Sequence, residues 1–310
     1  AGKLGCTSTS GPGMALKTEA MGLALMTELP LVVVNVQRGG PSTGLPTKTE
    51  QADLNQAIYG RNGEAPIPVL ACATVSDAFE CAIEACRIAV EYMTPVILLT
   101  DGYIANGAEP WKLPNIDELP KIKQKFAVAK EGEEFLPYSR DEKGARPWAK
   151  PGTPGLAHRI GGLEKAHLTG SVCYDSEHHE FMVHARAEKV AGIRDSIKTP
   201  EVHGPAKGDL LVLGWGSTYG AITESCEALR RKGKEVSQMH LRHLFPLPHG
   251  LAEIFANFKQ VLVPEINLGQ LARILRAEYP GVEFLSHGRV LGLPLSAHEL
   301  AGKIEGLLEN

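Results

Sequence analysis

Residues 31–51 read LVVVNVQRGGPSTGLPTKTEQ, a short apolar run followed directly by a segment rich in glycine and hydroxyl side chains. The run Leu31–Val34 is typical of a fully buried strand, because it is apolar without alternation. A similar run, Val96–Leu99, follows Pro95. Between the two runs, residues 76–93 carry apolar side chains three, four and seven positions apart, which predicts an amphipathic helix. Buried strands alternating with helices predict a parallel α/β sheet covered on both faces.

The remainder of the chain suggests two further regions. From 102 to 204 prolines recur and periodicity is poor. We expect this segment to be irregular, and to be functional or to wrap a partner, because long structureless segments are uncommon inside compact domains. Residues 208–310 show a second alternation of strands and helices, starting with the apolar run Leu210–Leu213. The predicted domains are therefore 1–204 and 205–310.

Composition excludes several classes of protein. The 310 residues include 32 basic and 36 acidic side chains, so no electrostatic footprint for nucleic acid or an anionic membrane is present. No apolar stretch reaches the roughly 18 residues of a membrane span. Six cysteines are scattered without a CxxC pair, which favours buried thiols in a reducing compartment and predicts a cytoplasmic protein. The histidine spacings match no zinc motif, so we expect no metal bound by this chain.

The segment after the first strand is predicted to recognise an anion. It lies beyond the carboxyl end of a strand, where ligands bind in open α/β sheets. Arg38 offers a planar fork that matches a carboxylate. Its neighbours are glycines that allow close backbone approach and hydroxyl side chains that donate hydrogen bonds, namely Gly39, Gly40, Gly44, Ser42, Thr43, Thr47 and Thr49. The alternative is a surface turn in which Arg38 forms an ordinary ion pair.

The same segment resembles the signature of 2-oxoacid:ferredoxin oxidoreductase alpha subunits, most closely those of the 2-oxoglutarate type. Further matching motifs follow in order along nearly all of the chain, at Thr7–Gly13, Tyr59–Glu64, Thr100–Tyr103, Pro151–Gly155 and Gly214–Thr218. The resemblance implies a fold of thiamine-diphosphate modules. A pyrimidine-side domain with a parallel sheet, truncated at its N-terminus, would be followed by an α/β domain like the C-terminal domain of transketolase.

The activity implied by the resemblance is the coenzyme A-dependent oxidative decarboxylation of 2-oxoglutarate to succinyl-CoA, with electrons passed to ferredoxin. Two alternatives stay open: the same reaction on pyruvate or branched-chain 2-oxoacids, and a non-catalytic assembly subunit. The chain carries neither cluster ligands nor a diphosphate–Mg²⁺ motif. The resemblance therefore assigns Mg²⁺ and [4Fe–4S] clusters to a beta subunit, with thiamine diphosphate shared between the two chains.

Motif position transfers functional roles to particular residues. Arg38 and Thr47 inherit contact with the 2-oxoacid, near the path of coenzyme A. The loop positions expected to bind substrate or coenzyme A beside them are Gly39, Gly40, Ser42 and Thr43. A glycine-rich turn that opens a helix inherits a place near the cofactor pocket through Ser10, Gly11 and Gly13. The alternative for this turn is a helix N-terminus capped by the Ser10 side chain.

The resemblance also implies a residue that this sequence lacks. In the family, a glutamate upstream of the Ser10 turn shares a proton with the aminopyrimidine ring. Residues 1–10 contain no carboxylate, and the first acidic residue is Glu19, inside a helix predicted over 14–26. We therefore expect the activating glutamate to lie before residue 1. The chain is expected to be the C-terminal part of a longer polypeptide and to open without a strand.

Overall fold

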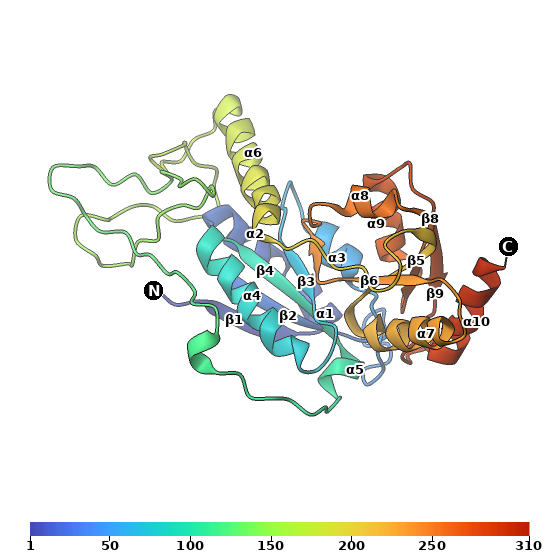
Figure 1. The fold of residues 1–310 in the computed structure, drawn as a ribbon. Helices are drawn as coiled ribbons and strands as arrows, with labels where there is room; N and C mark the ends of the chain where they lie inside the picture. The colour runs from blue at the N-terminus through green and yellow to red at the C-terminus, as the bar shows by residue number, and fades with distance from the viewer. Residues whose placement is uncertain (310) are drawn as a thin grey trace.

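The first of two sheets contains all four strands from residues 1–155. In a computed structural model, which describes residues 1–309, five strands form it in the order β1-β2-β4-β3-β7 (Figure 1). Four strands run parallel, and β7 is antiparallel to β3. The bounds are β1 (Gly5–Thr9), β2 (Leu31–Gln37), β3 (Val69–Ala71), β4 (Pro95–Asp101) and β7 (His243–Phe245). The second half of the chain thus contributes one edge strand to this sheet.

The second sheet is wholly parallel and has the order β6-β5-β8-β9. Its strands are β5 (Gly208–Trp215), β6 (Ser237–Leu241), β8 (Phe258–Glu265) and β9 (Phe284–Gly288). One hydrophobic core joins the two sheets, because Val33 and Ile97 of the first belong to the same cluster as Leu213 and Val263 of the second. The two sheets therefore share a buried layer.

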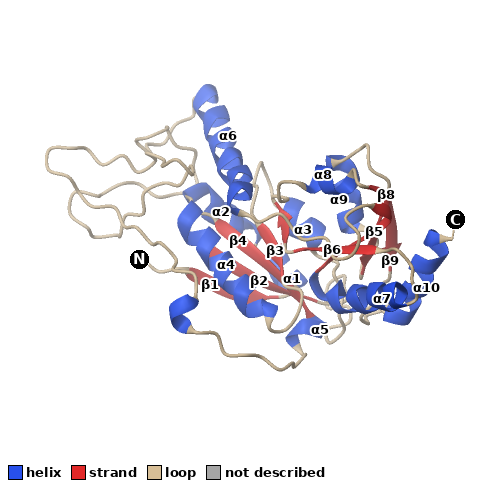
Figure 2. Ribbon diagram, in the orientation of Figure 1, coloured by secondary structure: helices blue, strands red, loops and turns tan. Residues whose placement is uncertain are grey.

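Helices fill the shared layer and cover the outer faces (Figure 2). The shared core includes side chains of α1 (Gly11–Ala15), α2 (Thr18–Thr27), α3 (Leu54–Tyr59), α8 (Leu251–Phe255) and α9 (Gln270–Glu278). The outer face of the first sheet packs on α4 (Asp77–Tyr92). The outer face of the second sheet packs on α7 (Tyr219–Arg231) and α10 (Ala297–Leu308). The predicted α/β class with parallel sheets covered on both faces is confirmed.

The strongest periodic segments fold as predicted. The two apolar runs form β2 and β4, each longer than its apolar part, and the helix predicted over 76–93 forms as α4, from Asp77 to Tyr92. The helix predicted over 14–26 is divided, because α1 ends at Ala15 and α2 begins at Thr18. The hydroxyl of Thr18 donates to the Ala15 carbonyl at the break. A side chain that bonds the backbone in this way competes with the helical hydrogen bonds.

The expectation that the chain opens without a strand is wrong. Residues 5–9 form β1, which pairs in parallel with β2 along its whole length. Its sequence, GCTST, carries no apolar run, because β1 is an edge strand whose side chains are mostly exposed or half-buried. Backbone pairing rather than side-chain burial holds it in the sheet.

The expectation of an irregular segment over 102–204 is wrong in part. Residues 176–192 form the long helix α6, which ends in the short 3₁₀ turn η2 (Ile193–Ser196), and 102–105 form α5. The buried stripe of α6 consists of Met182, Arg186, Lys189 and Val190. Because two of these four are charged, the stripe is hard to detect as an amphipathic pattern. Most of residues 106–175 is irregular, apart from the 3₁₀ turn η1 (Ile116–Glu118), and projects beyond α2 and α4 (Figure 1).

A buried ion network attaches this projecting region to the amino ends of the strands. The Glu28 carboxylate is fully buried and accepts hydrogen bonds from both terminal nitrogens of Arg140 and from Lys189 Nζ, each at 2.5 Å. Lys189 Nζ also donates to the Met93 carbonyl at 3.1 Å. Burial alone raises the pKa of Glu28, but Lys189 and Arg140 outweigh it and lower the pKa to about 2. Glu28 is therefore ionised at neutral pH.

Candidate functional site

The segment that follows β2 forms a closed, exposed loop, called here the arginine loop (residues 38–48). The Gly39 amide donates to the Lys48 carbonyl at 3.0 Å, and the Leu45 amide donates to the Gly39 carbonyl at 2.8 Å. Gly44 has a φ of +48°, and a Cβ atom there would overlap the Gly39 carbonyl oxygen. The loop geometry therefore requires glycine at 44. Ser42 and Thr43 lie at its exposed tip.

Arg38 lies at the base of the loop without a hydrogen-bonded partner. Its side chain is half-buried, and Nε is fully buried with no acceptor. Burial raises the pKa of Asp53, and the positive charge of Arg38 offsets part of this rise, yet Arg38 forms no ion pair with any of residues 1–309. The structure thus does not support the alternative of an ordinary ion pair. A buried guanidinium nitrogen without an acceptor is suited to an anionic ligand.

Asp53 connects Arg38 to the glycine-rich turn that opens α1. Asn35 Nδ2 donates to Asp53 Oδ2 at 3.0 Å, and a Cβ atom on Gly11 would come within 2.7 Å of the same oxygen. Burial raises the pKa of Asp53, which Asn35 and Arg38 partly offset. Asn35 Oδ1 is buried and has no donor. The structure therefore places the turn and Arg38 around one carboxylate that the sequence analysis did not single out.

The turn itself is not capped as the alternative interpretation required. The Ser10 side chain makes no capping hydrogen bond to the start of α1. Gly13 makes room for the Thr9 side chain, because a Cβ atom there would overlap Thr9 Oγ1. Packing within the chain thus accounts for glycine at 11 and 13. The role of Ser10, Gly11 and Gly13 in holding a cofactor stays a proposal.

Gln51 joins the arginine loop to the second sheet. Its amide nitrogen Nε2 donates to the Trp215 carbonyl at 2.8 Å, and its Oε1 accepts from the Ile266 amide at 3.0 Å. Its backbone is paired as well, with the Ile266 carbonyl and with Asn267 Nδ2. Gln51 is fully buried, so all its polar atoms are satisfied by residues some 164 to 216 positions away. This contact aligns the two sheets at their carboxyl ends.

Two buried acids, Asp101 and Glu265, lie at the strand ends near Gln51. These three residues are called here the wall around Gln51. Asp101, at the end of β4, accepts from the Tyr103 amide at 2.9 Å and from the Ser217 hydroxyl. Glu265, at the end of β8, accepts from the Leu271 amide at 2.8 Å and from Trp215 Nε1 at 3.2 Å. Burial raises the pKa of both carboxyl groups. Asp101 and Trp215 lie in motifs quoted above, but the sequence analysis missed Glu265, whose signal is an acidic residue at the end of an apolar strand.

Thr47 faces a different space from Arg38. A cavity of about 510 Å³ lies beside the loop and is lined by Thr47, Lys48, Tyr103 and residues 292–294. Gly292 packs closely on the loop, since a Cβ atom there would lie 2.9 Å from the Lys48 Cβ atom. The structure thus brings Arg38 and Thr47 into one loop, with Arg38 toward Asp53 and Thr47 toward the second half of the chain.

Comparison with known proteins identifies the family. Residues 1–172 match the family described as pyruvate flavodoxin/ferredoxin oxidoreductase, thiamine diphosphate-binding. The chain belongs to this family. The resemblance to 2-oxoacid:ferredoxin oxidoreductase alpha subunits is therefore confirmed. The 2-oxoglutarate oxidoreductase subunit KorA of Mycobacterium tuberculosis is 54% identical over 309 residues, which cover 99% of this chain and 47% of that protein.

Solved structures agree with the fold. The 2-oxoglutarate:ferredoxin oxidoreductase from Magnetococcus marinus, solved with 2-oxoglutarate, coenzyme A and succinyl-CoA bound, is 36% identical and superposes with a TM-score of 0.94. The match covers 99% of this chain and 54% of that one. A split-gene transketolase, 14% identical, covers 99% of this chain and 76% of its own with a TM-score of 0.51. It shows that the transketolase-like fold is shared.

The extent of these matches limits what is carried over. The chain spans about half the length of the first curated relatives that it matches. Within residues 1–309, no helix is both long enough and apolar enough to cross a membrane. The described part of the chain contains no group of three or more histidine, cysteine, aspartate or glutamate side chains arranged to hold a metal ion.

Proposed function

We propose that this chain is the alpha subunit of a 2-oxoacid:ferredoxin oxidoreductase that acts on 2-oxoglutarate. The observation that carries the proposal is the unpartnered, half-buried guanidinium of Arg38 at the base of the arginine loop. Similarity to KorA proteins and to a structure with 2-oxoglutarate and coenzyme A bound supports the choice of substrate. The 2-oxoacid carboxylate would accept two parallel hydrogen bonds from Arg38. Thr47, which faces the neighbouring cavity, would donate a hydrogen bond to another group of the substrate.

The residues at the carboxyl ends of β2 and β4 fit a polar cofactor. Asn35 Oδ1 and Arg38 Nε are a buried acceptor and a buried donor without partners in the chain. A bound thiamine diphosphate and its substrate would place polar groups against them, with the turn at Ser10, Gly11 and Gly13 nearby. Thiamine diphosphate supplies cleavage of the carbon–carbon bond beside a carbonyl group. The chain's own part is to orient the substrate carboxylate and to exclude water from the wall around Gln51.

The overall reaction requires partners. One 2-oxoglutarate, one coenzyme A and two oxidised ferredoxins would yield succinyl-CoA, CO₂, one proton and two reduced ferredoxins. We assign Mg²⁺ and the [4Fe–4S] clusters to a beta subunit, with the thiamine diphosphate site shared between the subunits. Ser42, Thr43 and the glycines of the loop, Gly39 and Gly40, would contact the 2-oxoacid or coenzyme A. The cytoplasmic location expected from the sequence is part of this proposal.

A substrate panel tests the proposed function. The protein, combined with the proposed beta subunit, is assayed with coenzyme A and a viologen dye. We expect 2-oxoglutarate to be oxidised with a kcat/KM at least tenfold above those of pyruvate and 2-oxoisovalerate. Preference for either of these would move the assignment to the alternative 2-oxoacids. A pair that assembles fully with cofactor and reduces no dye with any of the three would identify a non-catalytic subunit.

A further inference from the structure

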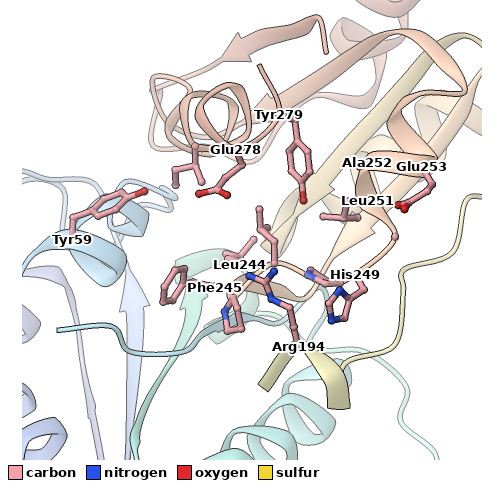
Figure 3. Close-up of a pocket in the computed structure, with 15 residues that line it drawn as sticks. Tyr59, Arg194, Leu244, Phe245, His249, Leu251, Ala252, Glu253, Glu278 and Tyr279 are labelled. Atoms are coloured by element: carbon pink, nitrogen blue, oxygen red, sulfur yellow. The ribbon is translucent and has the colours of Figure 1, made fainter. Parts of the chain in front are cut away.

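A second cavity lies far from the arginine loop, between α3, η2 and the second half of the chain. It has a volume of about 270 Å³, and it is lined by Tyr59, Arg194, residues 244–253, Ile274, Glu278 and Tyr279. Figure 3 shows Arg194 entering from one side, with the Glu278 carboxylate and the Tyr279 hydroxyl opposite. Ligand sites of small molecules usually occupy a few hundred Å³. The cavity is large enough for a ligand of few atoms.

Arg194 is the arginine that lines this cavity. Its Nε atom is buried without an acceptor, and its side chain forms no hydrogen bond or ion pair with the described residues. The neighbouring Asp195 is already paired with His249, at 2.8 Å. Buried donors in proteins are normally partnered. The free guanidinium therefore indicates a site for a carboxylate brought by a ligand.

Two acidic side chains also line the cavity. Glu278, at the end of α9, and Glu253, on α8, line the same cavity, and neither carboxylate is paired with Arg194. A simple anion would meet Arg194 but would be repelled by these acids. A simple cation would leave the guanidinium without a partner. A ligand carrying both charges satisfies the arginine and the acids.

Part of the remaining lining is apolar, although Tyr59 and His249 also line the cavity. Leu244, Leu247, Leu251 and Ile274 line the cavity and are at least nine-tenths buried. Apolar surface of this kind favours a hydrocarbon side chain on the ligand. We propose that the cavity binds a small apolar α-amino acid as a zwitterion, with its carboxylate on Arg194 and its ammonium group at Glu278. This site is independent of the proposed function.

The position of the cavity connects it to the candidate site. The helix α3 begins directly after Asp53 and ends at Tyr59, and α9 begins at Gln270 and ends at Glu278. Gln270 Nε2 donates to the Ala52 carbonyl at 2.7 Å, so both helices start at the wall beside Arg38. Their lengths, about 9 and 13 Å at 1.5 Å per residue, separate the cavity from that wall. A bound amino acid would hold the far ends of the same two helices.

Calorimetric titration of the whole purified chain tests the inference. L-leucine is the probe, and 4-methylpentanoate and 3-methylbutylamine are the matched compounds that lack the ammonium group and the carboxylate. We expect one saturable leucine site per chain, with a Kd below about 1 mM. Both matched compounds should bind at least tenfold more weakly. Absence of saturable leucine binding, or equal binding of 4-methylpentanoate, would overturn the inference.

Variants locate the site. Arg194→Met and Glu278→Gln should each weaken leucine binding at least tenfold. Glu278 is exposed, so Glu278→Gln should fold normally even if Arg194→Met does not. Arg231→Met, on the exposed face of α7, is the control and should bind leucine like the unmodified chain. Unchanged binding in a folded Glu278→Gln variant would show that the ammonium group is not held there, and would sink the proposal.

Discussion

Two arginines at opposite ends of the strands in the first sheet differ in how their charge is used. Arg140, at the amino ends of the strands, places both terminal nitrogens on the buried Glu28 carboxylate. Arg38, at the carboxyl ends, forms no hydrogen bond or ion pair within the described chain. An unsatisfied buried polar group costs about 1–3 kcal/mol. The contrast indicates that the residues at the amino ends of the strands stabilise the fold, and that Arg38 at the carboxyl ends is placed for a ligand.

The largest effect on stability is expected from Glu28, at the amino ends of the strands. Replacing Glu28 by glutamine leaves Lys189 and Arg140 buried without their counter-charge, which should reduce the free energy of unfolding by about 3–5 kcal/mol. Calorimetry should record a melting temperature lower by several degrees. Glu133→Gln breaks the exposed pair with Lys130 and should change stability by less than about 1 kcal/mol. Equal melting temperatures for the two variants would remove the structural role of the network.

Acid should weaken the molecule in two successive pH ranges that overlap slightly near pH 4. Burial lowers the pKa of His240 and of His243 to about 4, below the usual value near 6.5. The unfolded chain then binds protons first as the pH falls. The stability that depends on these two neutral histidines is therefore fully present above pH 6.5 and is lost between pH 6.5 and about 4. The paired Glu28, with a pKa lowered from 4.5 to about 2, contributes stability that is lost only below about pH 4.5.

A histidine variant separates the first range from the second. His240→Asn removes one titrating group and should recover about 3 kcal/mol of the stability lost between pH 6.5 and 4, taking 1.4 kcal/mol per pKa unit. Melting temperatures are compared at pH 7 and pH 4. His298→Asn, at an exposed position of α10, should lose as much stability as the unmodified chain. If His240→Asn shows the same loss, burial of His240 is not the source of the acid sensitivity.

The smallest effect on stability is expected from Gly44, in the arginine loop. Gly44→Ala forces a side chain into a left-handed conformation against the Gly39 carbonyl, a strain of about 1–2 kcal/mol that an exposed loop can relieve by moving. We therefore expect a nearly unchanged melting temperature but a kcat/KM for 2-oxoglutarate reduced at least tenfold. Gly302→Ala, exposed on α10 with open space around it, should leave activity unchanged. Equal activity of both variants would mean that the loop shape is not needed.

The sequence predicted those strands and helices whose apolar side chains form a pattern within the segment itself. The strands β2 and β4 and the helix α4 follow from apolar runs and helical periodicity within the segments themselves. The helix α6 was missed because its buried stripe includes Arg186 and Lys189, whose partners lie elsewhere in the chain. An edge strand of small polar residues such as β1 gives no periodic signal.

The same limit applies to the candidate site. The arginine loop could be predicted because its glycines, hydroxyl side chains and Arg38 are contiguous in the sequence. The wall around Gln51 could not, because its hydrogen bonds join residues 215 positions apart and depend on how the two sheets meet. Asp53 was missed for a similar reason, since its importance comes from its position between Asn35 and Arg38 in space.

Steady-state kinetics of Arg38 variants test the central claim most directly. In the assembled enzyme, Arg38→Ala should remove about 2–5 kcal/mol of transition-state stabilisation. The kcat/KM for 2-oxoglutarate should therefore fall at least about thirtyfold. Arg38→Lys should lose a similar amount, because a point charge cannot replace the planar fork. Both variants should keep their melting temperature, since Arg38 has no hydrogen-bonded partner to lose. An unchanged kcat/KM in a folded, cofactor-loaded Arg38→Ala enzyme would contradict the account.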